Sequence, residues 1–209
     1  MPSLEAYRRS LDYSYAPGLF PSMEALTRRP ELVRRVLLHS KAEHSDATER
    51  LLAICQSHNI RVETADRALA RLSGKENVFA AAVFAKEQAT LAQERNHLVL
   101  HQPSDGGNLG TMLRTALGFG YVDIAIIRPA ADAFDPRVVR ASMGAVFSLR
   151  LMEYEGFEAY RAKYPQHALY PFMLQGATSL QAASSSAASP HALVFGNEGS
   201  GLPEAFSKL

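Results

Sequence analysis

The segment "HLVLHQPSDGGNLGTMLRTALGFGYVDIAIIR", residues 97–128, contains two apolar runs separated by a glycine-rich loop and an amphipathic stretch. The runs at 97–102 and 123–128 are short and rich in Leu, Val and Ile, which is typical of buried strands. Residues 108–119 carry their apolar side chains at helical spacing. A strand, a helix and a second strand in this order predict a parallel sheet with helices packed against it.

The same alternation continues toward the end of the chain. Further strands are predicted at 145–153, 170–175 and 191–196, and further helices at 135–142, 156–163 and 178–187. We therefore predict an α/β domain over residues 97–209, built on a parallel sheet with helices on both faces.

The first part of the chain predicts a separate, smaller α/β domain over residues 1–90. Strands are predicted at 34–40, 61–65 and 78–85, and helices at 45–60, where Ser45 is a good N-cap, and at 66–74. The polar stretch 86–96 is predicted to be the linker between the two domains.

The charge of the chain is nearly balanced, with 22 Lys and Arg against 21 Asp and Glu. This balance gives no strongly basic footprint of a nucleic-acid-binding protein. Three arginine pairs, Arg8–Arg9, Arg28–Arg29 and Arg34–Arg35, are nevertheless candidates for contacts with an RNA backbone, because guanidinium groups pair well with phosphates. The alternative interpretation of these pairs is a solvated protein surface.

Cysteine usage and hydropathy indicate the cellular setting. Cys55 is the single cysteine and lies in an apolar stretch, so we expect a buried thiol in a reducing, cytoplasmic environment. No apolar run approaches the length of a membrane span, and the histidines lack companions at metal-ligand spacing. We therefore expect neither a membrane nor a metal. The final Ser207-Lys208-Leu209 matches a peroxisomal address, which we interpret as accidental.

Glycine-rich loops follow three of the predicted strands of the second domain, at 103–107, 176–179 and 196–202. Carboxyl ends of parallel strands meet at one edge of a sheet, so we expect the chemistry there. None of the loops matches the spacing of a dinucleotide fingerprint or carries the lysine of a P-loop. Glu198 would repel a phosphate, so the last loop suits an uncharged or cationic ligand, such as a sulfonium. An oxidoreductase that binds a dinucleotide is therefore disfavoured.

Two polar side chains accompany the first of these loops. Asn108 stands where the helix is expected to begin, and its structural interpretation is an N-cap, which competes with a role in the site. Arg114 lies off the buried stripe of that helix and is either a solvated arginine or a group that holds an anion.

Taken together, these segments resemble the SpoU/TrmH family of RNA 2′-O-ribose methyltransferases, members of the SPOUT superfamily. The first family motif is matched by Asn108, Gly110 and Arg114, and the following segment by "FDPRVVRASMGAVFSL" at 134–149. The second motif is matched by "LVFGNEGSGL" at 193–202. The resemblance spans residues 97–206. The first domain resembles, in its pattern of apolar runs, the ribosomal-protein-like RNA-binding domain that often precedes this catalytic domain.

The resemblance implies a function and a set of site residues. It implies methylation of an RNA ribose 2′-hydroxyl with S-adenosylmethionine, in a homodimer whose sites lie near the subunit interface. Catalytic roles are implied for Asn108, Arg114 and Glu198, with Arg114 also contacting RNA. Contacts with the cofactor are implied for Gly176, Ala177, Thr178, Gly196, Asn197, Gly199, Gly201 and Leu202. The RNA-binding-like first domain favours ribosomal RNA as the substrate and leaves transfer RNA as the alternative.

A third family motif, which completes the knot and contacts the adenine, has no match in residues 1–209. Two interpretations stay open, a shortened chain and a relative that has lost cofactor binding, and the intact second motif favours the first. Either interpretation predicts an incomplete knot and weak binding of S-adenosylmethionine by the chain as printed. A non-catalytic RNA-binding protein is accordingly the competing functional hypothesis.

Overall fold

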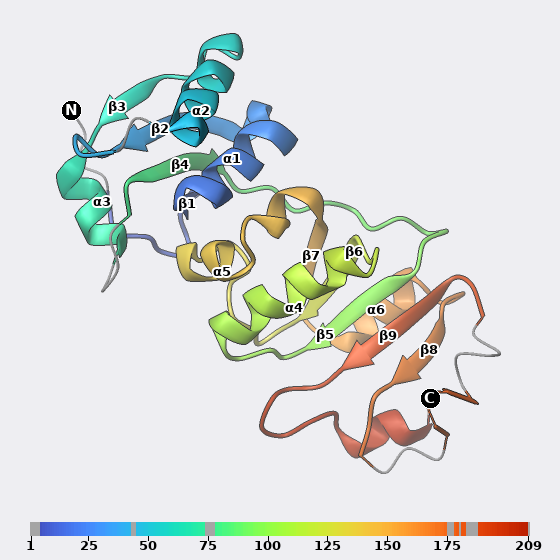
Figure 1. The fold of residues 1–209 in the computed structure, drawn as a ribbon. Coiled ribbons are helices and arrows are strands. Elements are labelled where there is room, and N and C mark those ends of the chain that lie inside the picture. Colours follow the sequence, from blue (N-terminus) through green and yellow to red (C-terminus); the bar gives the residue numbers. More distant parts are fainter. Residues whose placement is uncertain are drawn as a thin grey trace. The chain divides into compact units, whose positions relative to one another are not determined.

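The computed structural model describes residues 5–42, 45–73, 78–174, 178–179, 181–182 and 188–208. The chain forms two compact units, and each of them contains segments that are distant in the sequence (Figure 1). Unit 1 comprises Met1–Glu87, Gly110–Arg114 and Asp132–Ser148, and unit 2 comprises Gln88–Leu109, Thr115–Ala131 and Leu149–Leu209. The domain boundaries predicted from the sequence, 1–90 and 97–209, stay a prediction.

Unit 1 is built on a four-stranded sheet in the order β1-β4-β2-β3. Its strands are β1 (Tyr13–Pro17), β2 (Val33–Leu38), β3 (Val62–Thr64) and β4 (Ala80–Ala85). Its helices are α1 (Leu19–Arg28), α2 (Asp46–Ser57), α3 (Asp66–Ser73) and α5 (Pro136–Ala141), with short 3₁₀ turns η1 (Pro30–Leu32) and η2 (Ala145–Ser148). The strand β4 is central and antiparallel to both β1 and β2, whereas β2 and β3 are parallel.

The sequence prediction of the first domain is confirmed for β2, β3, β4, α2 and α3. Ser45 is the N-cap of α2, where its hydroxyl accepts a hydrogen bond from the Thr48 N–H. Cys55 is buried, as expected, and burial raises the pKa of its thiol to about 11. The structure adds β1 and α1, for which the sequence analysis made no prediction.

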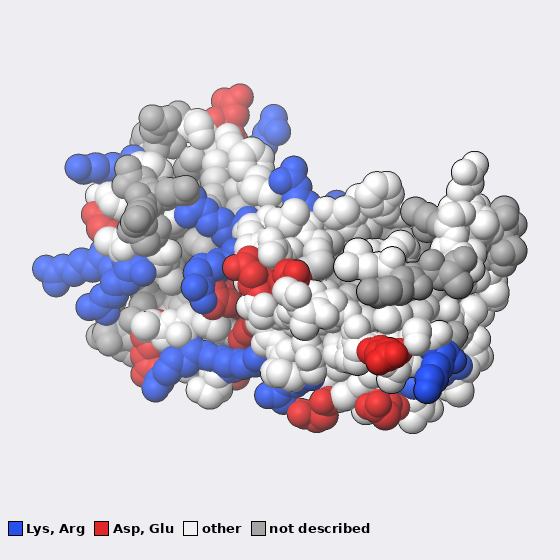
Figure 2. Space-filling model, turned by 90° about the horizontal axis from the view of Figure 1, so that it is seen from below, with Lys and Arg blue, Asp and Glu red and all other residues white. Residues whose placement is uncertain are grey.

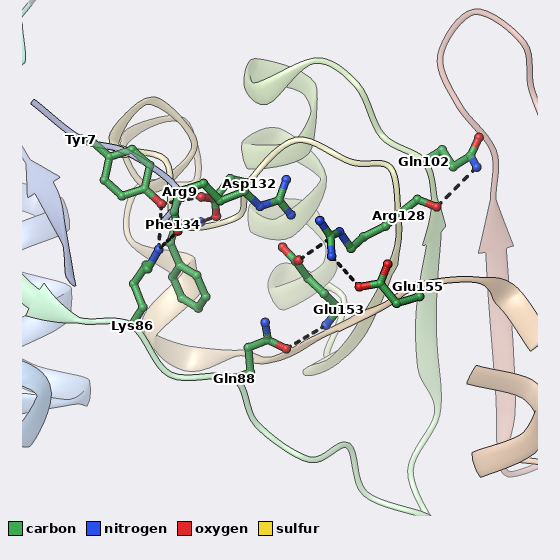
Figure 3. A network of polar contacts seen from close by, with 10 residues as sticks. All are labelled: Tyr7, Arg9, Lys86, Gln88, Gln102, Arg128, Asp132, Phe134, Glu153 and Glu155. Atoms are coloured by element: carbon green, nitrogen blue, oxygen red, sulfur yellow. Dashed lines mark hydrogen bonds and ion pairs between the residues drawn. The ribbon is translucent and has the colours of Figure 1, made fainter. Parts of the chain in front are cut away.

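The segment 132–148 belongs to unit 1 because its side chains pack against β1 and β4. Phe84 of β4 contacts Phe147 edge-on, with ring centroids 4.8 Å apart. The Ser14 hydroxyl donates a hydrogen bond to the Phe134 carbonyl. The Tyr7 hydroxyl donates one to Asp132 (Figure 3). These contacts fix the segment that precedes β7 on the first unit.

Unit 2 is a five-stranded, wholly parallel sheet in the order β7-β6-β5-β9-β8. Its strands are β5 (His97–His101), β6 (Asp123–Ile127), β7 (Arg150–Tyr154), β8 (Ala168–Pro171) and β9 (His191–Phe195). Its helical elements are α6 (Phe157–Lys163) and the turn η3 (Glu204–Lys208), together with both ends of α4 (Gly106–Gly118). The predicted parallel α/β sheet is therefore confirmed.

The core of unit 2 lies between the sheet and α6. Phe157 and Tyr160 of α6 pack against Val99 and Val194 of the two central strands, and Phe206 closes the same cluster. All residues of β5 and β6 are buried, which explains why both strands appear in the sequence as continuous apolar runs. Figure 1 shows α4 on the face opposite α6.

Three predicted elements differ from the structure. The strand predicted at 170–175 is observed as β8 at Ala168–Pro171, because these are the residues that pair with His191–Val194 of β9. Residues 145–148 form the turn η2 instead of the start of a strand, because Gly144 has a φ of +80° and turns Phe147 into the unit 1 core. Residues 86–96 contain no helix or strand, but they are not a free linker, since Leu91 is buried in unit 2. Most of the predicted helix 178–187 lies outside the described residues.

Candidate functional site

The loops that follow β5 and β9 lie at the same edge of the unit 2 sheet. These strands are parallel neighbours, and their register pairs Leu100 with Phe195, so their carboxyl ends are side by side. The loop residues are 102–105 after β5 and 196–202 after β9. This edge is where α/β sheets usually bind ligands.

Glu198 joins the two loops. Its carboxylate accepts hydrogen bonds from the backbone N–H of Ser104 at 3.1 Å and from the Ser104 hydroxyl at 3.0 Å. It also accepts one from the Asp105 N–H at 3.2 Å and one from the Asn197 side-chain amide at 3.2 Å. The sequence prediction placed Glu198 at this edge, and the structure gives it a definite task in holding the loops.

The hydrogen bonds to Glu198 decide its protonation state. Desolvation raises the pKa of this carboxyl, but the bonds from backbone N–H groups and from the Ser104 hydroxyl outweigh that effect and lower the pKa to about 2. The carboxylate is therefore ionised at neutral pH and is a weak proton acceptor, which makes Glu198 a poor general base.

Asn197 organises the loop after β9. Its side-chain oxygen accepts hydrogen bonds from the N–H groups of Gly199 at 2.9 Å and Ser200 at 3.1 Å. Its amide nitrogen donates to the Gln102 carbonyl at 2.8 Å. The side chain of Asn197 is thus engaged within the protein, and a ligand at this loop would meet backbone groups instead.

The glycines of this loop permit a tight turn. A Cβ atom at Gly196 would lie 2.3 Å from the backbone carbon of Gly201 and 2.4 Å from the Leu202 nitrogen, so no side chain fits there. Gly201 has a φ of +67°, a conformation that favours glycine. Leu202 then turns into the core of unit 2 and anchors the end of the loop.

The helix α4 begins at the same edge, but not where the sequence predicted. The interpretation of Asn108 as N-cap is wrong, because Asp105 is the N-cap and its carboxylate accepts a hydrogen bond of 2.7 Å from the Asn108 N–H. Both residues suit an N-cap, and the first of them takes the position because Glu198 fixes its backbone. The Asn108 side chain therefore takes no part in capping α4.

Asn108 and Arg114 expose their side chains on α4. Neither side chain makes a hydrogen bond or an ion pair with any residue in the described part of the chain. Gly110, one turn before Arg114, allows α4 to approach α5 closely, since a Cβ there would lie 2.6 Å from the Ala141 Cβ. The first motif therefore presents two exposed polar side chains, Asn108 and Arg114, on a helix that Gly110 allows to lie close to α5.

The comparison with protein families decides the classification. The sequence model of the SpoU rRNA Methylase family matches residues 95–209, which is more than half of the chain. The chain belongs to the SpoU rRNA Methylase family. The resemblance stated from the motifs is thereby confirmed.

Individual relatives agree with the SpoU rRNA Methylase assignment. The chain is 32% identical over 127 residues to the 23S rRNA (guanosine(2553)-2'-O)-methyltransferase RlmP of Bacillus subtilis, covering 60% of this chain and 50% of the relative. It is 40% identical over 55 residues to rRNA methyltransferase 3, mitochondrial, of Homo sapiens, covering 26% of this chain and 13% of the relative. The chain thus matches an eighth to a half of the length of these relatives.

A solved structure shows the same fold. The AdoMet-bound rRNA methyltransferase from Sinorhizobium meliloti superposes with a TM-score of 0.73 at 21% identity, covering 94% of this chain and 75% of that one. The likeness extends over both units of this SpoU family member, and at this identity it concerns the fold alone.

For the remaining residues that the SpoU resemblance assigns to the cofactor, the described part of the structure shows no contact that bears on this role. Gly176 and Ala177 lie outside the described residues, and Thr178 is exposed in a bend. Gly199 is exposed at the turn that follows Glu198. The predicted contacts of these residues with a cofactor stay predictions.

Of the arginines predicted to touch RNA, those of the pairs Arg28–Arg29 and Arg34–Arg35 all have carboxylate partners in the described part of the chain, unlike Arg114. The ion pairs are Arg28–Glu24, Arg29–Glu31, Arg29–Glu87, Arg34–Asp12 and Arg35–Glu63. Figure 2 shows the same mixture of acidic and basic side chains on the surface of unit 1. The exposed pairs among them, such as Arg34–Asp12, are worth only about 0–1 kcal/mol, whereas Arg35–Glu63 is partly buried. RNA binding by these residues stays a prediction.

Sequence reasoning missed Ser104 and Asp105, which supply the donors for Glu198 and the cap of α4. A signal was available, since both residues lie between the end of a buried strand and the start of a helix. The described residues contain no group of three or more His, Cys, Asp or Glu that could hold a metal ion. No helix in the described ranges is long and apolar enough to cross a membrane.

Proposed function

We propose that this protein transfers a methyl group from S-adenosylmethionine to a ribose 2′-hydroxyl of ribosomal RNA. The supporting observation is the pair of loops joined by Glu198 at the carboxyl edge of the sheet, within the range that matches the SpoU rRNA Methylase family. RlmP, which is 32% identical over half of its length, is named for this reaction on 23S rRNA.

The residues at this edge suit a cationic cofactor. Glu198 keeps a negative charge there at neutral pH, and the neighbouring turn is made of glycines with an exposed backbone. S-adenosylmethionine supplies an electrophilic methyl carbon on a positively charged sulfur. The bound cofactor would supply this carbon to the 2′-hydroxyl and leave as the neutral thioether, and the hydroxyl proton would be lost to water or to a nearby base.

Each catalytic residue has a task that follows from its surroundings. Arg114, exposed and without a partner among the described residues, contacts the RNA backbone and stabilises the negative charge that develops on the 2′-oxygen. Stabilisation of this kind is worth about 3–4 kcal/mol. Asn108 orients the substrate with its free amide, and Glu198 positions the loops and takes no proton.

The wider setting completes the proposal. We infer that the protein is a cytoplasmic homodimer in which residues 1–90 bind the RNA substrate, with Arg28, Arg29, Arg34 and Arg35 exchanging carboxylates for phosphates. Transfer RNA is the alternative substrate, and RNA binding without catalysis is the alternative function.

A transfer assay separates these possibilities. The protein, as printed and extended by the third family segment, is incubated with labelled S-adenosylmethionine and unmodified ribosomal or transfer RNA, which is then hydrolysed with alkali. A 2′-O-methyl group blocks cleavage, so we expect a labelled, alkali-resistant dinucleotide from ribosomal RNA. RNA binding without label transfer in either form would contradict the proposed activity.

A further inference from the structure

The connector, residues 88–96, joins the end of unit 1 to β5 and lies on unit 2. It has no helix or strand, yet Leu91 is only 2% exposed and belongs to the core behind the sheet. Side chains of unit 2 hold its backbone at several points. The contacts are Ala92 N–H to Asp123 at 2.9 Å, Ala92 O to His97 Nε2 at 2.8 Å, Arg95 O to His167 Nε2 at 2.8 Å, and Leu91 O to Tyr164 Oη at 3.2 Å.

Two of these groups, His97 and His167, form the histidine clasp. Both are almost completely buried, with 0% and 1% of their surfaces exposed. Their rings stack with centroids 4.1 Å apart and an angle of 29° between the planes. One ring comes from the start of β5 and the other from the loop before β8, so the clasp joins distant parts of unit 2 to the connector.

Hydrogen bonding defines the neutral form of each ring. A carbonyl only accepts, so Nε2 of each histidine carries the hydrogen. Nδ1 of His97 then accepts from the Tyr160 hydroxyl at 3.0 Å. Nδ1 of His167 is buried and has no hydrogen-bond partner in the described part of the chain.

Protonation is unfavourable for this arrangement. A second proton on His167 would bury an N–H group without an acceptor, and two protonated rings would stack cation on cation. Burial lowers the pKa of both imidazoles. The charged and titratable groups around the pair come from all neighbouring elements: Arg95, Asp123, Arg150, Tyr160, Arg161, Tyr164 and His191.

We propose that the histidine clasp is an acid-sensitive latch, in which uptake of protons by His97 and His167 frees residues 88–96 from unit 2 while the parallel sheet stays paired. Above the ordinary histidine pKa of about 6.5, both rings are neutral in the open and in the closed state. Protonation then favours neither state, and the hydrogen bonds to the connector keep the clasp closed. Below this pKa the open state binds protons that the closed state refuses. The equilibrium constant for opening then rises by about fivefold per histidine between pH 6.5 and 5.5, or about thirtyfold for the pair, and by about tenfold per histidine for each further pH unit.

Hydrogen exchange on the full chain tests the latch. Protection factors are measured at pH 7.5, 6.5 and 5.5, each against unstructured peptides at the same pH. The reporters are the connector amides of Ala89 and Ala92, which donate to Leu151 O and Asp123. We expect their protection to fall by about thirtyfold between pH 6.5 and 5.5, while the amides of Val99 and Ile126 in the sheet keep theirs.

Matched variants assign the effect. In the double variant His97→Gln/His167→Gln, the amides can still donate to the carbonyls but do not titrate, so the pH dependence should vanish. His167→Gln alone, which keeps the fully bonded His97, should leave about a fivefold fall. The control His58→Gln, at the exposed end of α2, should behave like the parent protein.

Two results would overturn the proposal. One is an equal loss of protection in the sheet and the connector of the parent protein, which would mean unfolding of unit 2 as a whole. The other is an unchanged pH dependence in His167→Gln, whose fold is checked by circular dichroism.

Discussion

The two edges of the unit 2 sheet differ in how polar groups are used. At the carboxyl edge, Glu198 is exposed and ionised, and it joins two glycine-rich loops through charge-assisted hydrogen bonds. At the amino edge, His97 and His167 are buried and neutral, and they hold the irregular connector against the core. The first edge keeps backbone and charge available to a ligand, whereas the second removes its polar groups from water.

The difference shows where function and stability reside. A ligand needs exposed groups that are fixed in place, and the Glu198 loops provide them. A buried polar cluster such as His97 and His167 instead needs all of its hydrogen-bond partners, since each buried group left without one costs free energy. Substitutions at the carboxyl edge should therefore affect activity, and those at the amino edge should affect the attachment of the connector.

The largest effect is expected from Arg114→Ala, on the helix that begins at the carboxyl edge. Loss of the guanidinium removes stabilisation from the reacting oxygen, so the rate of methyl transfer should fall by about 10²–10³-fold. The matched control is Arg95→Ala, an exposed arginine of the connector outside residues 1–90, which should transfer methyl groups at the parent rate. Near-normal transfer by Arg114→Ala would remove Arg114 from the mechanism.

A smaller but clear effect is expected from Gly196→Ala at the start of the loop after β9. The new Cβ would lie 2.3 Å from the Gly201 backbone, so the loop must shift, at a cost of about 1–3 kcal/mol in the free energy of unfolding. Urea denaturation measures this change. The control Gly118→Ala has nothing within 4 Å of the new Cβ and lies in α4, so it should stabilise the protein slightly. Equal stability of the two variants would mean that the turn is looser than described.

The smallest effect concerns the charge of Glu198. Its folded-state pKa of about 2 lies below the reference value of 4.5, so its contribution is present above about pH 4.5 and is lost as the pH falls through 2. Because the residue is exposed, we expect Glu198→Gln to cost at most about 1 kcal/mol at pH 6 and nearly nothing at pH 2. A difference that grows as the pH falls would contradict the assignment of Glu198 as an ionised link between the loops.

The sequence predicted the parallel sheet because β5 and β6 are buried on both faces and appear as uninterrupted apolar runs. It did not predict η2, because the run containing Val146 and Phe147 has the composition of a strand. Only the packing of Phe147 on Phe84 distinguishes the two structures. The strand β1 contains serine and proline, and its burial depends on pairing with the distant β4.

The candidate site was predicted in its residues but not in its connections. The motifs located Asn108, Arg114 and Glu198, because glycine-rich loops after parallel strands mark the ligand edge. The cap at Asp105 and the donors from Ser104 depend on a contact with Glu198, more than ninety residues away in the sequence. The stacking of His97 on His167 likewise joins residues that only the fold brings together.

Hydrogen exchange with and without ligand tests most directly the claim that the carboxyl edge is the functional one. The protein, in the extended form used for the transfer assay, is compared alone and with saturating S-adenosylmethionine and ribosomal RNA. We predict new protection at residues 102–105 and 196–202 and unchanged protection in the connector. Protection confined to the connector, with the Glu198 loops unaffected, would contradict ligand binding at the carboxyl edge of the sheet.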